Sequence, residues 1–129
     1  MVMATGVDVV RIDRIEGLLE RSSRRFEQRV FTAAEVTECR RNPWPARRFA
    51  QCFALKEAVL KAAGTGMAQD TRWHDIEAQF RAEGEAPVLR ISGRVAELVG
   101  GCGADRWLGT VGACRRFAVA LVVLEGRHA

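Results

Sequence analysis

The spacing of apolar residues changes near the middle of the chain, from the period of helices to the alternation of strands. A short β-branched segment at residues 5–10 predicts an opening strand that contains one carboxylate, Asp8. Four apolar residues then recur at helical spacing, which predicts a helix directly after that strand. The four residues are Ile12, Ile15, Leu18 and Leu19.

Two further helices are marked by the residues at their ends. Thr32 and Glu35 have the spacing of a capping box, so we expect a short helix that begins at Ala33 and ends before the Asn42-Pro43-Trp44-Pro45 segment. The longest helical pattern covers residues 46–63, and Gly64 is expected to stop it.

The second half of the chain is typical of strands. Four strands and one short helix with Ser92 as its cap are predicted. The strands are residues 73–81, 88–92, 107–114 and 117–125, and the helix is residues 94–99. Helices followed by adjacent strands indicate an α+β fold. We expect one compact domain over residues 1–129, with a mainly antiparallel sheet packed against the long buried helix.

Composition limits the class of protein. The 129 residues are 48% hydrophobic and 28% charged, which is ordinary for one globular domain. No apolar run approaches the roughly 20 residues of a membrane span, and the first ten residues do not resemble a signal peptide. The four cysteines are scattered without a C-x-x-C pair, so we expect reduced thiols in a cytoplasmic protein and no zinc site.

The net charge of +4 is concentrated in one region. Between residues 11 and 48 every basic residue is an arginine, the side chain suited to bidentate contact with carboxylate or phosphate. These arginines are Arg11, Arg14, Arg21, Arg24, Arg25, Arg29, Arg40, Arg41, Arg47 and Arg48. Two interpretations stay open: a solvated helix surface, or a docking face for an anionic partner. A nucleic-acid partner is disfavoured because the arginines lack interleaved aromatic residues.

The long helix carries charges that its apolar surroundings do not explain. Lys56, Glu57 and Lys61 lie among apolar neighbours, and a buried charge is costly unless it is paired or bound. One interpretation is a surface i,i+4 salt bridge between Glu57 and Lys61. The alternative is that Glu57 and Asp8 hold a cation while the lysines meet a negatively charged ligand. Mg²⁺ takes one or two protein carboxylates and fills its other positions with water and phosphate oxygens.

The motifs around these charges resemble a known family. The segments Gly6-Val7-Asp8-Val9-Val10, residues 53–62 (FALKEAVLKA) and Gly64-Thr65-Gly66 are similar to those of 4′-phosphopantetheinyl transferases of the holo-acyl-carrier-protein synthase type. The resemblance runs along the whole chain in the right order. It implies transfer of the phosphopantetheine arm of coenzyme A to a serine of a carrier protein, with release of adenosine 3′,5′-bisphosphate.

The resemblance also implies roles for individual residues. Asp8 and Glu57 match the carboxylates that bind Mg²⁺, with Glu57 also helping to remove the serine proton. Lys61 matches a lysine that contacts phosphate and is counted with Glu57 as catalytic. Residues expected to contact coenzyme A are Lys56, Lys61, Gly64, Gly66 and Arg48.

A partner and an assembly follow from the same resemblance. The arginine-rich helix is expected to dock the acidic helix of an acyl or peptidyl carrier protein, which fatty-acid, polyketide or peptide synthesis would use. The docking residues are expected to be Arg14, Leu18, Arg21, Arg25 and Arg29. Single-domain members of the family are trimers with each active site between neighbouring subunits, so a homotrimer is expected.

Two departures from the family pattern leave an alternative open. Gly112-Ala113-Cys114 stands where the family commonly carries Ser-His-Thr or Ser-His-Asp, with the histidine near the 3′-phosphate of the coenzyme. Cys52 stands where many members have arginine. The alternative is a catalytically impaired relative that binds carrier protein without efficient transfer.

Overall fold

The computed structural model describes residues 1–22, 24–64, 70–82 and 84–127. Three long strands form an antiparallel sheet in the order β1-β5-β4, and a separate antiparallel pair joins β2 to β3. The strands are β1 (Val2–Arg11), β2 (Ile76–Gln79), β3 (Val88–Ile91), β4 (Arg106–Ala113) and β5 (Phe117–Glu125). The predicted mainly antiparallel α+β fold is confirmed.

Five α-helices and one 3₁₀ turn complete the described part of the chain. They are α1 (Ile12–Arg21), α2 (Arg25–Val30), α3 (Ala33–Arg41), α4 (Pro45–Ala62), η1 (Trp73–Asp75) and α5 (Gly93–Gly101). The capping box of α3 forms as predicted, with Thr32 Oγ1 accepting from the Glu35 amide and Glu35 accepting from the Thr32 amide. Gly64 follows the end of α4 with a φ of +77°, which favours glycine.

Three local predictions need correction. Residues 73–75 form η1 and not the start of a strand, because the Asp75 amide donates to the Arg72 carbonyl and closes a turn. Helix α2 was not predicted, since its six residues are too few to show a period. Ser92 occupies the N-cap position of α5 but makes no side-chain capping bond; its hydroxyl donates to the Asp75 carbonyl instead.

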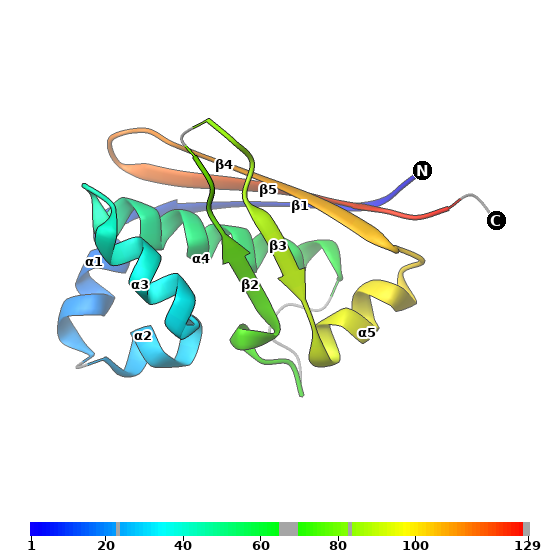
Figure 1. The fold of residues 1–129 in the computed structure, drawn as a ribbon, viewed down its shortest axis with the longest axis horizontal. Helices are drawn as coiled ribbons and strands as arrows, with labels where there is room; N and C mark the ends of the chain where they lie inside the picture. Colours follow the sequence, from blue (N-terminus) through cyan, green and yellow to red (C-terminus); the bar gives the residue numbers. More distant parts are fainter. Residues whose placement is uncertain (23, 65–69, 83, 128–129) are drawn as a thin grey trace.

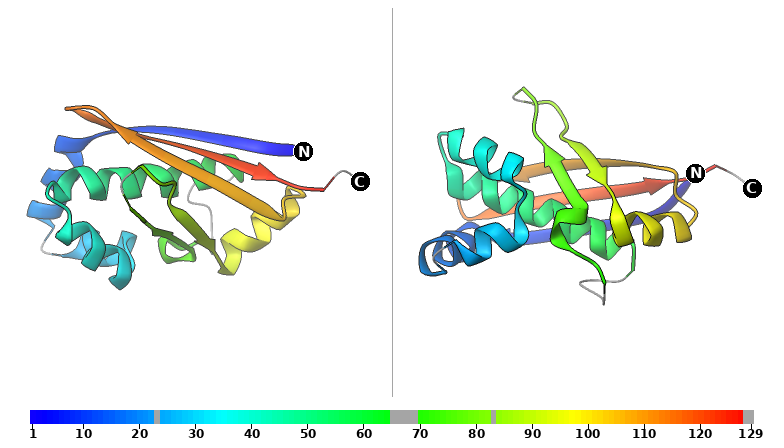
Figure 2. Two further views of the ribbon diagram at one scale, coloured as in Figure 1. Left: turned by 45° about the horizontal axis from the view of Figure 1, so that its top comes forward. Right: turned by 60° about the horizontal axis from the view of Figure 1, so that its bottom comes forward.

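Helix α4 is the centre of the core. All the helices and the β2-β3 hairpin lie on one side of the three-stranded sheet, with α4 directly beneath it (Figures 1 and 2). Alternate residues of β5 point toward α4 and are buried, namely Ala118, Ala120, Val122 and Leu124. Within the described ranges, no helix combines the length and the apolar character needed to cross a membrane.

The opposite side of the sheet is apolar and uncovered in a single chain. Because side chains alternate along a strand, the residues between the buried ones point away from α4. They are 38% to 63% exposed, and the pairing of β1, β5 and β4 makes them contiguous. This apolar outer face consists of Val7, Val9, Leu108, Phe117, Val119 and Leu121.

Candidate active site

Strand β1 approaches α4 closely at Gly6. A Cβ atom at this position would lie 2.0 Å from the Ala58 carbonyl oxygen and 2.9 Å from the Ala62 amide nitrogen. Only glycine therefore permits the two backbones to come this close. Asp8 is two residues further along the same face of β1, so the contact carries its carboxylate to the Glu57–Lys61 turn of α4.

An ion pair joins the two elements beside this contact. Lys61 Nζ lies 2.8 Å from Asp8 Oδ1 and 3.2 Å from the Val7 carbonyl oxygen. The Asp8 side chain is 13% exposed, whereas that of Lys61 is 51% exposed, so the ammonium group faces solvent and the carboxylate is recessed. The hydrogen bond that Lys61 donates to Asp8 raises the pKa of Lys61. Burial opposes this rise, and the negative charges of Asp8 and Glu57 add to it.

Glu57 lies within electrostatic reach of Asp8. Burial raises the pKa of Glu57, and the negative charge of Asp8 raises it further, while Lys61 and Arg14 act to lower it. In the described part of the chain Glu57 makes no ion pair with Lys61, so the proposed i,i+4 salt bridge does not form. The site thus holds two carboxylates, of which Asp8 raises the pKa of Glu57, and one lysine that pairs only with Asp8.

This arrangement fits a hard divalent cation. A cation between Asp8 and Glu57 would remove the repulsion that raises the pKa of Glu57. Among the described residues no third histidine, cysteine or acid completes a metal cage. Mg²⁺ needs no such cage, because water and phosphate oxygens supply its remaining ligands. Asp8 and Glu57 are therefore the residues that would hold it.

Lys56 lies away from this site. Its side chain is completely buried, with Nζ 2.6 Å from Glu35 Oε1 and donating to the carbonyl oxygens of Val30 and Trp73. Glu35 Oε2 accepts from the Ala78 amide at 2.7 Å and from the Cys52 thiol at 3.3 Å. A lysine enclosed in this way cannot reach a coenzyme in solution, so the position of Lys56 disagrees with the expected ligand contact.

Cys52 is placed in the same interior network. Burial raises the pKa of its thiol well above the usual range, and the neighbouring Cys39 and Glu35 raise it further. The side chain is fully buried, so Cys52 presents nothing to a phosphate group. Sequence reasoning noticed Glu35 only as a helix cap. A buried lysine needs an acidic partner, and this need was the signal that could have paired Glu35 with Lys56.

The remaining residues expected to contact the coenzyme are placed in different ways. Gly64 is exposed at the end of α4, one turn beyond Lys61, and Gly66 lies outside the described residues. Arg48 lines a pocket between the first half of α4, the loop after β2 and the end of β4. That pocket also contains Arg81, which sequence reasoning missed because nothing in the periodicity of residues 73–81 places it near α4.

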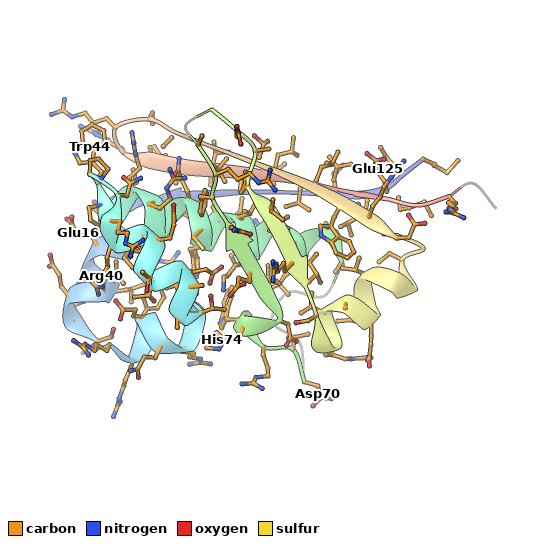
Figure 3. The ribbon with its side chains drawn as sticks, viewed as in Figure 1. Glu16, Arg40, Trp44, Asp70, His74 and Glu125 are labelled. Carbon is orange, nitrogen blue, oxygen red and sulfur yellow. The ribbon has the colours of Figure 1, made fainter. Side chains whose placement is uncertain are left out.

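The expected docking residues are found on the α1–α2 side of the molecule. Arg14, Arg21, Arg25 and Arg29 are exposed, and Leu18 is half-buried between the first two. Arg14 acts electrostatically on Glu57, so this surface adjoins the carboxylate pair. Arg40, labelled in Figure 3, forms an ion pair with Glu27, so its charge is less available to a docking partner.

Comparison with known proteins places this geometry in a family. Residues 4–110 match the family model of the 4′-phosphopantetheinyl transferase superfamily. A holo-[acyl-carrier-protein] synthase from Koribacter versatilis is 38% identical over 97% of this chain and 99% of its own. The crystal structure of the Neisseria meningitidis holo-[acyl-carrier-protein] synthase superposes with a TM-score of 0.84 at 27% identity, covering 97% of this chain and 99% of its own.

A second crystal structure was solved with the coenzyme. The Helicobacter pylori holo-[acyl-carrier-protein] synthase in complex with coenzyme A superposes with a TM-score of 0.79 at 27% identity, over 94% of this chain and 99% of its own. The chain belongs to the 4′-phosphopantetheinyl transferase superfamily. These three relatives are holo-[acyl-carrier-protein] synthases, which confirms the resemblance seen in the sequence motifs.

Proposed function

We propose that this protein transfers the 4′-phosphopantetheine arm of coenzyme A to a serine of an apo acyl carrier protein and releases adenosine 3′,5′-bisphosphate. The observation that carries the proposal is the convergence of Asp8, Glu57 and Lys61 where β1 meets α4, in a chain similar over nearly its whole length to holo-[acyl-carrier-protein] synthases. Two acids and a lysine suit phosphoryl-type transfer, because that reaction depends on positioning and on neutralising charge.

The proposed mechanism assigns one task to each of the three residues. Asp8 and Glu57 would hold Mg²⁺, which when bound would supply a positive charge for the diphosphate of the donor. Lys61, held by Asp8 with its ammonium group toward solvent, contacts a phosphate oxygen. Glu57 accepts the serine proton, directly or through water.

The carrier protein is proposed to dock on the exposed arginines beside this site. An acidic helix lying across Arg14, Arg21 and Arg25 would bring its serine toward Glu57, because Arg14 already lies within electrostatic reach of that carboxylate. Arg29 and the half-buried Leu18 extend the same surface. Opposite charge at such a surface speeds association and makes its rate depend on salt.

A homotrimer is proposed as the working assembly. The support in this chain is the apolar outer face of the sheet, whose six large side chains are left uncovered in a monomer. Contiguous exposed apolar surface of this kind marks an interaction site. A second copy is the natural occupant if each active site lies between neighbouring subunits.

The impaired-relative alternative rests on the turn between β4 and β5. Ala113 and Cys114 are exposed there, and neither offers a cationic donor to a phosphate group. Backbone hydrogen bonds from Arg116 and Phe117 lower the pKa of Cys114, and a thiol carries no positive charge in either of its protonation states. Under this alternative the arginine surface still binds carrier protein, but transfer is slow.

The deciding experiment is mass spectrometry of an apo acyl carrier protein after incubation with coenzyme A, Mg²⁺ and this protein. The expected result is a mass gain of one phosphopantetheine group on the acceptor serine, and none when the carrier's serine is replaced by alanine. Absence of the gain, together with measurable binding of the carrier, would favour the impaired relative. Absence of both would reject the proposed function.

A further inference from the structure

Helix α2 depends on other parts of the fold for its position. It has six residues, and a helix this short is marginal without packing against other elements. Its N-cap residue, Arg24, has a φ of +73°, a left-handed conformation that is unfavourable for a residue with a Cβ atom. The Arg24 side chain makes no capping hydrogen bond. The place of α2 is therefore set mainly by its tertiary contacts.

A buried lysine holds the end of α2. Lys56 Nζ lies 2.6 Å from the carbonyl oxygen of Val30, the last residue of α2, and 3.2 Å from the carbonyl oxygen of Trp73 in η1. One ammonium group thus joins two elements that pack side by side (Figure 1). The Lys56 side chain is completely buried, so water does not compete for these hydrogen bonds. A charged donor makes them roughly twice as strong as neutral hydrogen bonds.

Glu35 completes the surroundings of the ammonium group. Its Oε1 lies 2.6 Å from Lys56 Nζ, and its Oε2 accepts from the Ala78 amide of β2. A lysine has three donors, so Val30, Trp73 and Glu35 can take all of them. Lys56 and Glu35 therefore connect α2, α3, α4, η1 and β2 at one point in the interior.

The other contacts of α2 are of a different kind. The Phe26 ring packs on Phe53 of α4 with 6.0 Å between the ring centres, and Glu27 pairs with Arg40 of α3. An apolar contact is not directional, whereas a hydrogen bond is. The bonds of Lys56 are thus the directional link between α2 and α4 that the hydrogen bonds of the described residues provide.

This link joins the proposed docking surface to the catalytic carboxylate. Lys56 directly precedes Glu57 on α4, and Val30 directly follows Arg29 on α2. Arg25 and Arg29 are both exposed and are among the residues proposed to bind the carrier. A carrier held by these arginines brings its serine to Glu57 only if α2 keeps its distance from α4. A misplacement of about 1 Å can cost on the order of 100-fold in rate.

We propose that Lys56 and Glu35 are positioning residues for transfer, which set the place of α2 and of its docking arginines relative to Glu57. The inference rests on the proposed function, which assigns carrier docking to α1 and α2. An ammonium group enclosed by three acceptors has no donor left for a phosphate. The effect of the pair therefore falls on the carrier substrate and not on coenzyme A.

Steady-state kinetics with each substrate tests this role. The Lys56→Met/Glu35→Gln double variant removes both charges and so leaves no unpaired carboxylate in the interior. Its kcat/KM for the carrier should fall at least about tenfold, while its KM for coenzyme A should stay within about twofold of the parent value. Glu35→Gln alone, which keeps the lysine, should show the same selective fall at a smaller size and serves if the double variant does not fold.

The matched control is Leu124→Ala. Leu124 is fully buried on β5, which packs against β1, β4 and α4, so its truncation destabilises the core away from the network. Its kcat/KM for the carrier should equal that of the parent. Hydrogen exchange supplies a structural measurement: the amides of α2 should exchange faster in the double variant but not in the control.

The outcomes separate this inference from the proposed function. An unchanged kcat/KM for the carrier in a folded double variant would overturn the positioning role and leave the proposed function standing. An equal fall in the Leu124→Ala control would also overturn it, because the loss would then follow from stability alone. If the parent shows no transfer, calorimetry with the carrier decides: weaker binding by the double variant alone would support the positioning role and reject transfer, and equal binding would overturn both.

Discussion

Lys56 and Lys61 lie five residues apart on α4, yet their ammonium groups have opposite surroundings. Lys56 is enclosed by Glu35 and two backbone carbonyls, whereas Lys61 pairs with Asp8 at the surface. The difference follows from helix geometry, because five residues turn the side chain by about 140°. One lysine thus faces the interior between α2, α3 and η1, and the other faces β1.

The buried pair allows a stability prediction. Lys56→Met should destabilise the fold by about 3–5 kcal/mol, because it leaves the Glu35 carboxylate buried without its cation. Adding Glu35→Gln should restore part of this loss by removing the unpaired charge. Urea unfolding of the single and double variants measures both effects. If the single variant folds, its Kd for coenzyme A should be unchanged; a Kd raised tenfold at unchanged stability would instead return Lys56 to the binding site.

The carboxylate pair allows a prediction about metal and catalysis. Glu57→Gln should lower kcat/KM for carrier modification at least about 100-fold, since it removes a metal ligand and a proton acceptor. Mg²⁺ at 100-fold above its Kd should stabilise the parent protein by about 2.7 kcal/mol, and should stabilise neither Glu57→Gln nor Asp8→Asn to that extent. The mass-spectrometric assay measures the loss of kcat/KM, and thermal melting with and without Mg²⁺ measures the stabilisation by the metal. Equal stabilisation of all three proteins would place the metal elsewhere.

The same carboxylates set a pH dependence in the absence of metal. The pKa of Glu57 is raised in the folded state, so the folded protein binds more protons there than the unfolded chain does. Stability therefore falls as pH rises from the ordinary pKa of a glutamate through the raised one, and Glu57→Gln should lack this fall. Melting temperatures of the two proteins across that range should accordingly converge at low pH and diverge, in favour of the variant, at higher pH.

At the scale of elements, the site depends on the contact between β1 and α4. Gly6 sets their separation, and the pairing of β1 with β5 sets which β1 residues face the helix. A shift of one residue in that register would turn Asp8 to the outer face and Val7 toward α4. The position of one carboxylate is thus fixed by a backbone contact two residues away.

Gly6→Ala tests this contact. The added Cβ would meet the Ala58 carbonyl oxygen at 2.0 Å, so the strand must move away from the helix. We expect a loss of about 3 kcal/mol or more in stability, with loss of transfer activity in any folded fraction. Gly100→Ala is the control, because its Cβ meets nothing within 4 Å inside α5 and should stabilise the protein by about 0.5–1 kcal/mol. A neutral Gly6→Ala variant would show that the contact does not position Asp8.

At the scale of the whole molecule, the sheet has two unlike faces. The inner face packs on α4, while the apolar outer face is open in one chain (Figure 2). The exposed arginines Arg14, Arg21, Arg25 and Arg29 lie on α1 and α2, outside that outer face. The proposed contact between copies of the chain and the proposed contact with an acidic partner would therefore use different surfaces.

The apolar outer face predicts self-association, and the family resemblance predicts that the assembly is a trimer. Sedimentation should show a trimer for the parent protein and smaller species for the Val119→Asp/Leu121→Asp double variant, since two charges would be buried at the interface. Trp44→Asp, an exposed apolar residue outside the sheet, should leave the trimer intact. A parent protein that is monomeric at all concentrations would contradict the proposed assembly.

The arginine surface predicts how the carrier protein binds. Arg21→Glu/Arg25→Glu should weaken binding of the carrier by on the order of 1–3 kcal/mol for each well-made contact and reduce its salt dependence. These two arginines are chosen in place of Arg14 because the charge of Arg14 acts on Glu57, so replacing Arg14 would alter the active site itself. Coenzyme A affinity should be unchanged, and Arg90→Glu is the matched control. Carrier binding that is insensitive to the double reversal would leave the arginines as a solvated surface.

The sequence by itself determined what depends on neighbours along the chain. Hydrophobic periodicity predicted β1, α1, α4 and β5, and the Thr32–Glu35 spacing predicted the start of α3, because caps and periods are local properties. The motifs around Asp8 and Glu57 identified the family. The short α2 and η1 escaped prediction, since a few residues carry too little pattern.

Only the tertiary structure decided which charged groups meet. The sequence offered Lys56 and Lys61 alike as ligand contacts, and packing enclosed the first with Glu35 and left the second beside Asp8. It also brought Arg81 from the second half of the chain to Arg48 on α4. Pairs of this kind are separated by 21, 53 and 33 residues in the sequence. Their proximity is set by how strands and helices pack, and no local pattern of residues contains that information.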